Sequence, residues 1–254
     1  MPAHLARGGA LSPAPARPAR GNGERRFRAD IEGLRAVAVL AVVLYHAHVG
    51  ILRGGYVGVD VFFVISGFLI TDLLWREVAS TRRVSFAAFY ARRVRRLLPA
   101  AVLVLIVTMA AAARWMPPLQ VSSVWKDGLA CALYVGNYRF AVQSTNYLSA
   151  SAPPSPFQHY WSLGVEEQFY LLWPLLLVVA AGVLLRRRPS RQYAAVGLAA
   201  IAAASFVASL ILTKADEPWA FFSLPTRAWE LAAGGLVALA APSLSRMPER
   251  WAPA

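Results

Sequence analysis

The chain has 254 residues, of which 57% are hydrophobic and only 15% are charged. A soluble domain carries about 25% charged residues, so the composition excludes an ordinary soluble protein and favours a membrane protein. The net charge of +13 would suit nucleic acid, but the arginines lie between apolar runs, as the positive-inside rule predicts, and we expect no nucleic-acid partner. One cysteine, Cys131, excludes an internal disulfide and a cysteine metal cluster; we expect no metal site.

The apolar runs begin after a polar N-terminal segment. Residues 1–28 are rich in Ala, Pro, Arg and Gly and lack periodicity, which predicts a disordered cytoplasmic tail and not a cleaved signal peptide. A weaker run, residues 124–142, contains four polar or charged side chains. Six clear runs are each near the ~20 residues that a helix needs to cross a bilayer: 34–52, 56–75, 97–113, 168–185, 193–213 and 224–241.

Basic residues predict the orientation. With a cytoplasmic N-terminus and a segment 124–142 that does not cross, most arginines fall on the inner side; if that segment crossed, those from Arg186 to Arg191 would lie outside. The sequence therefore predicts an all-α, polytopic transmembrane helix bundle of six to seven spans. Its single membrane domain covers residues 29–245, and a tail covers residues 246–254.

Ionisable residues inside membrane spans are functional candidates by default. Arg35 and His46 lie eleven residues apart in the first span. Eleven steps of ~100° return to within about 20° of the start and rise about 16 Å, so both side chains share one stripe of the helix. A substrate with an anionic head and a long arm could lie along it, although a snorkelling arginine and a packed histidine would give the same spacing.

A glycine-rich block, residues 54–68, permits close backbone approach between helices. It places Asp60 near the outer end of the second span, at a depth similar to that of His46. Asp60 either orients a catalytic histidine or serves as a helix cap or ion-pair partner.

Arginines cluster before the third span. The pairs Arg92/Arg95 and Arg93/Arg96 are spaced i, i+3, so each pair lies on one side of a helix. Guanidinium groups at the cytoplasmic face suit phosphate groups, but topological anchoring explains the same cluster.

Acidic residues open two later spans. Glu166 and Glu167 begin the fourth clear span on the predicted outer side, where either the helix dipole stabilises them or one works with His46 in a cavity. Arg227 and Glu230 are spaced i, i+3 and can pair with each other.

At these residues the sequence resembles the acyltransferase 3 family of bacterial membrane proteins, typified by O-antigen and peptidoglycan O-acetyltransferases. The resemblance covers residues 27–241 and departs from the family in length, because members have about ten helices and many continue into a soluble domain. We therefore expect the N-terminal part of such a protein. Five blocks in order carry the match: Asp30-Ile31-Glu32-Gly33-Leu34-Arg35 with His46, the glycine-rich block ending Ser66-Gly67-Phe68-Leu69, Phe89-Tyr90-x-Arg92-Arg93-x-Arg95-Arg96-Leu97-x-Pro99, Trp161-Ser162-Leu163-x-Val165-Glu166-Glu167-Gln168-Phe169-Tyr170, and Pro225 to Glu230.

The resemblance implies a multi-pass protein of the bacterial cytoplasmic membrane. It would transfer an acyl group, typically acetyl, from cytoplasmic acyl-CoA to a hydroxyl of an extracytoplasmic glycan or envelope polysaccharide such as lipopolysaccharide. Acyl-CoA, the glycan, membrane lipid and a partner chain that supplies missing helices are the expected partners. The implied site consists of Arg35 and His46, of Arg92, Arg93, Arg95 and Arg96 for the CoA phosphates, and of the acidic Glu166 and Glu167.

The mechanism expected from the residues and the family uses His46 as the general base, with Glu167 or Asp60 holding its imidazole. A covalent acyl-histidine and direct transfer both remain open. A transporter or flippase of an envelope precursor, and a catalytically inactive truncated scaffold, are the alternatives; labelled acetyl-CoA would separate them, because only an enzyme moves label onto glycan.

Overall fold

The computed structural model describes residues 28–50, 53–145, 153–180 and 189–244, so the predicted tails lie almost wholly outside the described residues. All regular elements in the described part are helical, which confirms the all-α prediction. They are α1 (Ala29–His46), the 3₁₀ helix η1 (Gly55–Val57), α2 (Gly58–Thr81), α3 (Phe86–Trp115), α4 (Pro118–Ala132), α5 (Gly136–Thr145), α6 (Tyr160–Ala180), α7 (Arg191–Ala215), α8 (Glu217–Phe222) and α9 (Leu224–Leu244).

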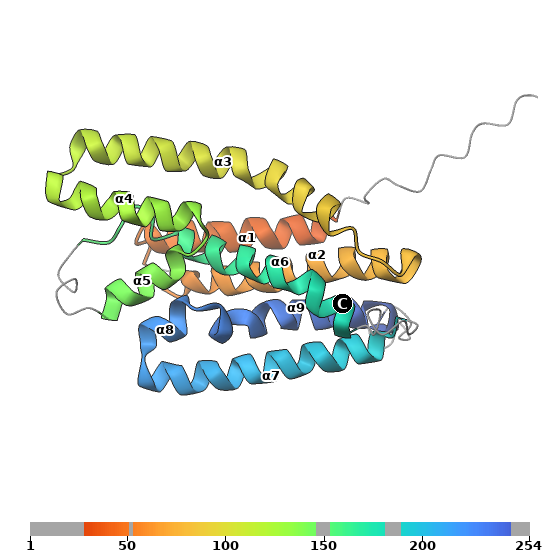
Figure 1. The fold of residues 1–254 in the computed structure, drawn as a ribbon. Helices are drawn as coiled ribbons and strands as arrows, with labels where there is room; N and C mark the ends of the chain where they lie inside the picture. The colour runs from red at the N-terminus through yellow and green to blue at the C-terminus, as the bar shows by residue number, and fades with distance from the viewer. Residues whose placement is uncertain (1–27, 51–52, 146–152, 181–188, 245–254) are drawn as a thin grey trace, which may run out of the picture.

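The long helices lie side by side and alternate in direction (Figure 1). Helix α2 is central and packs against α1, α6 and, most extensively, α9, which α7 covers. Two ends of the bundle follow from this arrangement. The end where α1 stops and α2, α6 and α9 start is called the His46 end; the opposite end, at the α2–α3 turn, is called the Arg82 end.

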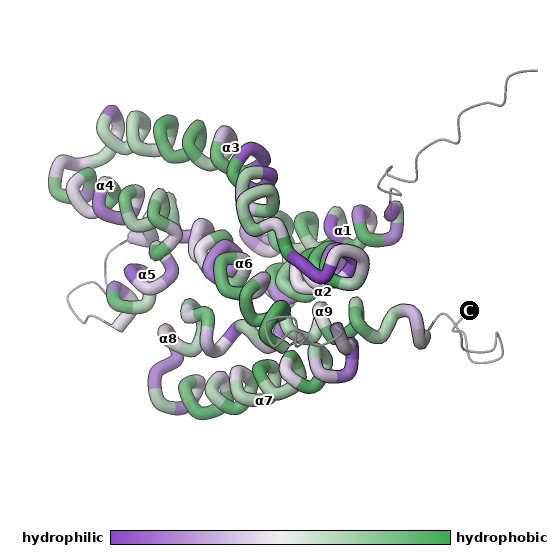
Figure 2. Tube along the Cα trace, turned by 45° about the vertical axis from the view of Figure 1, so that its right-hand side comes forward, coloured by the Kyte–Doolittle hydropathy of each residue, from purple (hydrophilic) through white to green (hydrophobic). Residues whose placement is uncertain are grey.

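Four helical stretches are long and apolar enough to cross a membrane: Gly55–Thr81, Phe86–Trp115, Tyr160–Ala180 and Arg191–Ala215. In the most apolar windows of α3 and α7 only 11% of the residues are buried, and Figure 2 shows hydrophobic residues along both helices. A soluble bundle would cover such surfaces, whereas lipid can solvate them. The chain is therefore a helical membrane protein.

The first and last expected spans also form helices, α1 and α9, but these are not among the four. Helix α1 has 18 residues, including Asp30, Glu32 and Arg35. Helix α9 has 21 residues, including Arg227 and Glu230. The charges of α1 pair locally, Asp30 with Arg28 and Glu32 with Arg35, whereas Arg227 of α9 pairs with Glu230 and with Asp60 of α2.

Segment 124–142 does not form one helix. It divides between α4, with 15 residues, and α5, with 10 residues. Between them Tyr134 has a left-handed φ of 55°, which ends one helix before the next begins. Helix α4 folds back along α3 (Figure 1), and neither piece reaches the ~20 residues of a span.

Glycines allow the backbones of α2 and α9 to approach closely, as the glycine-rich block predicted. A Cβ atom added to Gly67 of α2 would collide with the backbone of Leu231 in α9. In the same interface a Cβ on Gly234 would collide with the carbonyl of Val64. The two backbones approach so closely only because neither glycine has a side chain.

Candidate active site

Arg35 and His46 both belong to α1, which is one continuous helix, as the predicted stripe requires. Arg35 donates to Glu32 Oε1 at 3.2 Å, and its guanidinium lies 6.0 Å from the ring centre of Phe62 in α2. Its side chain remains 31% exposed. Arg35 is thus held loosely by its own helix and retains donors for an anionic ligand.

His46 is the last residue of α1, and its ring Nδ1 lies 2.8 Å from the carbonyl oxygen of Val42, one turn earlier. A carbonyl oxygen can only accept, so Nδ1 carries the proton of this hydrogen bond. In the neutral ring, Nε2 is then the nitrogen with a free lone pair. A backbone carbonyl therefore fixes the tautomer that a general base at Nε2 requires.

His159 contacts His46 and was not among the predicted site residues. The two ring centroids are 4.7 Å apart and the ring planes meet at 86°. His159 lies in the turn before α6, anchored by Phe157, which is fully buried. Burial, and then the neighbouring His46, lower the pKa of His159 below its usual value. Its position two residues before the Trp161–Tyr170 block was the available signal.

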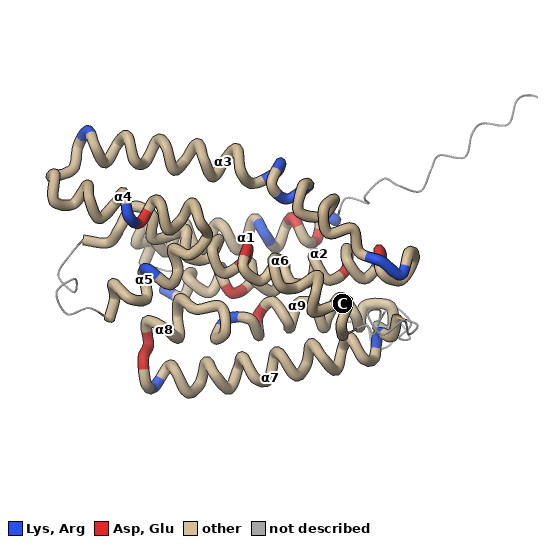
Figure 3. Tube along the Cα trace, viewed as in Figure 1, with Lys and Arg blue, Asp and Glu red and all other residues tan. Residues whose placement is uncertain are grey.

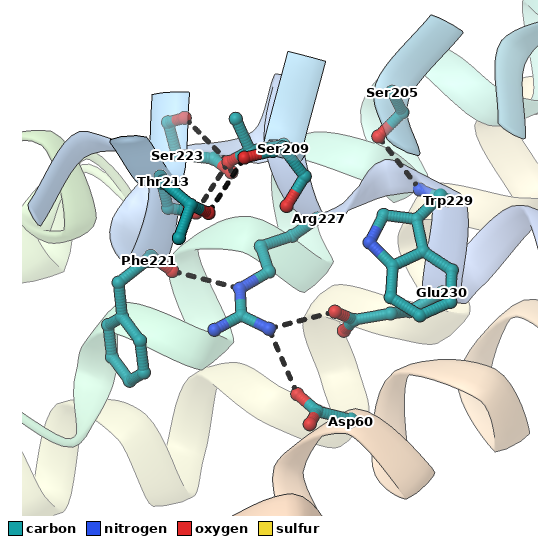
Figure 4. A network of polar contacts seen from close by, with 11 residues as sticks. Asp60, Ser205, Ser209, Thr213, Phe221, Ser223, Arg227, Trp229 and Glu230 are labelled. Carbon is teal, nitrogen blue, oxygen red and sulfur yellow. Dashed lines mark hydrogen bonds and ion pairs between the residues drawn. The ribbon is translucent and has the colours of Figure 1, made fainter. Parts of the chain in front are cut away.

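Asp60 belongs to a different cluster at the His46 end (Figure 4). Arg227 Nη1 donates to Asp60 Oδ1 at 3.1 Å and to Glu230 Oε1 at 2.8 Å. Arg227 Nε donates to the carbonyl of Phe221. The predicted Arg227–Glu230 pair is confirmed. The expectation that Asp60 orients His46 is not matched by these contacts, because the carboxylate joins α2 to α9 through Arg227.

Glu167 also has an arginine partner. Arg93 of α3 donates to Glu167 through Nη2 at 2.5 Å and Nε at 3.1 Å, and lies 3.4 Å from the ring centre of Tyr170. Glu166 accepts from Ser66 at 2.6 Å and from the Tyr170 hydroxyl at 2.7 Å. These partly buried groups connect α2, α3 and α6.

The arginine cluster and the acidic pair therefore meet, although the sequence placed them on opposite sides of the membrane. Arg93 turns inward, with only 21% of its side chain exposed, and bonds Glu167. Arg92, Arg95 and Arg96 are exposed. Helical spacing showed which arginines share a side, but not which side faces α6. Within the described chain, the contacts favour Arg93 and Glu167 as partners of each other over the separate roles expected for them with phosphate and imidazole.

The fold and the site together define a helical membrane protein with paired charges in its interior. At one end of the bundle it carries a histidine whose tautomer is fixed by a backbone carbonyl. The chain belongs to the acyltransferase family whose model, described as an acyltransferase domain, matches residues 28–253. No solved structure gives a significant match.

Similar proteins include O-acetyltransferases, two of which have peptidoglycan in their names. The putative peptidoglycan O-acetyltransferase YrhL of Bacillus subtilis is 34% identical over 229 residues, which are 89% of this chain and 36% of that protein. Peptidoglycan O-acetyltransferase OatA of Listeria monocytogenes is 34% identical over 86% of this chain and 35% of its own length. O-acetyltransferase OatA of Staphylococcus aureus is 33% identical over 84% and 34%. The chain thus spans about a third of these relatives.

Proposed function

We propose that this chain is the membrane domain of an O-acyltransferase of the bacterial cytoplasmic membrane. It would transfer an acyl group, in the simplest case acetyl, from cytoplasmic acyl-CoA to a hydroxyl of an extracytoplasmic glycan, with peptidoglycan as the leading acceptor. Family membership and the names of the relatives support this function. Because the matched residues are only about a third of those relatives, further parts of such a protein would contribute to the complete reaction.

The observation that carries the proposal is the hydrogen bond between His46 Nδ1 and Val42 O at 2.8 Å. It leaves Nε2 to take the proton of the glycan hydroxyl while the oxygen attacks the thioester carbonyl. The C–S bond breaks, and the CoA sulfur then receives the proton from the imidazolium. Base assistance of this kind contributes about 10²–10⁴-fold.

The donor would enter from the Arg82 end. Figure 3 shows basic residues gathered at the α2–α3 turn and along the start of α3, which supports a cytoplasmic location for this end and for the N-terminus. The exposed Arg92, Arg95 and Arg96 suit the phosphates of CoA. Arg35 lies about 16 Å from His46 along α1, toward the Arg82 end.

The carboxylates would act as positioning residues. Glu167 and Glu166 link α6 to α3 and α2 through Arg93 and Ser66. Asp60 links α2 to α9 through Arg227. Both clusters include α2, the long helix that packs against α1, so the proposed role of these acids is to fix the position of α2 against the helix that carries His46.

The test is transfer of labelled acetyl from acetyl-CoA to glycan by membranes that contain the protein. We expect His46→Asn to lower the rate by about 10²-fold or more at an unchanged protein level. His48→Asn is the matched control: it lies two residues away, and its φ of 55° is one that asparagine tolerates. A wild-type rate for His46→Asn would overturn the proposal.

A further inference from the structure

A cavity of about 450 Å³ lies between α4, α5 and the segment 153–158 that leads into α6. This volume is within the range of sites that bind small molecules. Its apolar wall includes Phe140 and three prolines, Pro153, Pro154 and Pro156. Its polar wall includes Gln120, Ser123, Asp127, Gln143, Ser144 and Gln158.

Asp127 is the ionisable residue of this wall, and its side chain is only 3% exposed. Arg139 Nε donates to it at 2.5 Å and Gln143 Nε2 at 2.8 Å, and both bonds go to the same oxygen, Oδ1. Among the described residues no donor reaches Oδ2. The carboxylate is thus neutralised by an arginine and still offers an acceptor oxygen to a ligand hydroxyl.

The lining selects against the acyl donor. No Lys or Arg is among the described residues that line the cavity, whereas CoA phosphates require cations or clustered N–H donors. Amide, hydroxyl and carboxylate groups instead both donate and accept, as sugar hydroxyls do. The ring of Phe140 and the prolines offer apolar surface to the C–H faces of a sugar.

The cavity adjoins the candidate base. Gln158 lines it, and the next residue, His159, contacts the His46 ring at 4.7 Å. Consecutive Cα atoms are about 3.8 Å apart, so the backbone of the cavity wall at Gln158 is one residue away from the histidine that contacts His46. Helices α4 and α5 and the start of α6 all approach the His46 end (Figure 1).

We propose that this cavity is a glycan subsite, which holds an uncharged sugar unit of the acceptor chain while a neighbouring unit presents its hydroxyl to His46. The inference rests on the proposed function, because it assigns the acceptor of the same reaction. It adds the location of that acceptor and a preference for sugar units without anionic groups at this position.

The experiment measures binding of chitotetraose, a β-1,4-linked oligomer of N-acetylglucosamine, to the protein in nanodiscs by titration calorimetry. Ser123→Trp fills the cavity and is expected to weaken binding by about tenfold or more. Ser122→Trp is the matched control, since Ser122 is also exposed on α4 but does not line the cavity. If Ser123→Trp does not fold, Ser144→Trp fills the same cavity from α5.

The outcomes separate the subsite from the catalytic proposal. His48→Asn, which lies outside both the cavity and the proposed catalytic machinery, should leave chitotetraose binding unchanged. Weaker binding in Ser123→Trp but not in Ser122→Trp supports the subsite whether or not His46 proves catalytic. Wild-type affinity in the cavity-filling variant, equal losses in both tryptophan variants, or no binding by the wild type would each overturn the subsite.

Discussion

The rings of His46 and His159 meet edge to face, with centroids 4.7 Å apart and planes at 86°. One ring ends α1 and the other lies in the turn before α6. His46 has no following helical turn to hold it, so its orientation depends on the Val42 carbonyl, on the ring of Tyr45 and on this contact with His159. We therefore expect His159 to act as a positioning residue for the candidate base.

Replacing His159 should lower the rate of acyl transfer without abolishing it. An edge-to-face aromatic pair contributes about 0.5–1.5 kcal/mol, which corresponds to a loss of about 2–10-fold in His159→Ala. His159→Phe supplies a ring edge but no titrating nitrogen and should recover most of the rate, with KM for the acceptor unchanged. Equal losses in both variants would show that His159 acts through its nitrogens.

His159 should also make stability depend on pH. Burial lowers its pKa in the folded protein, while the unfolded chain keeps a value near 6.5. As pH falls below about 6.5, the unfolded state binds the proton first, so stability present at neutral pH is lost. Between about pH 7.5 and about pH 5.5, the thermal unfolding midpoint should fall more in wild type than in His159→Gln.

The exposed His48 provides the control for this measurement. His48→Gln should keep the acid dependence of the wild type, because its ring takes no part in the histidine contact. The same pH dependence in wild type and His159→Gln would contradict the assignment.

Helical periodicity predicted the arrangement along single helices but not the contacts between them. The Arg35–His46 stripe and the Arg227–Glu230 pair follow from spacing, because both members lie on one helix. The partners of Asp60 and Glu167, and the second imidazole beside His46, lie on other helices or turns, and the spacing of residues along one helix cannot predict how helices pack against each other. Residue His159 was overlooked because its role exists only through its contact with α1.

Breaking the Arg93–Glu167 pair should destabilise the bundle. Removing Arg93 leaves two partly buried carboxylates without their cation, Glu167 and also Glu166, which lies 3.8 Å from the same guanidinium; this costs about 3 kcal/mol. Arg93→Met should therefore lower the unfolding midpoint most, and Glu167→Met should lower it less, because Glu166 remains as a counterion for Arg93. Arg95→Met removes an exposed arginine of the same helix and should leave the midpoint unchanged.

An Arg93 that instead bound donor phosphate would behave differently. Its substitution would then raise KM for acyl-CoA and leave stability near that of Arg95→Met. The two measurements together decide which partner Arg93 serves.

Close packing of α2 against α9 should make Gly67 intolerant of any side chain. The added methyl of Gly67→Ala would collide with the Leu231 backbone, and backbone cannot yield as a flexible side chain does. Overpacking costs about 1–3 kcal/mol, which exceeds the gain of about 0.5–1 kcal/mol in helix propensity. Thermal unfolding should therefore show a lower midpoint. The control is Gly33→Ala in α1, where nothing lies within 4 Å of the new Cβ, and this variant should be neutral or stabilising. A higher unfolding midpoint in both variants would contradict the close contact between the α2 and α9 backbones.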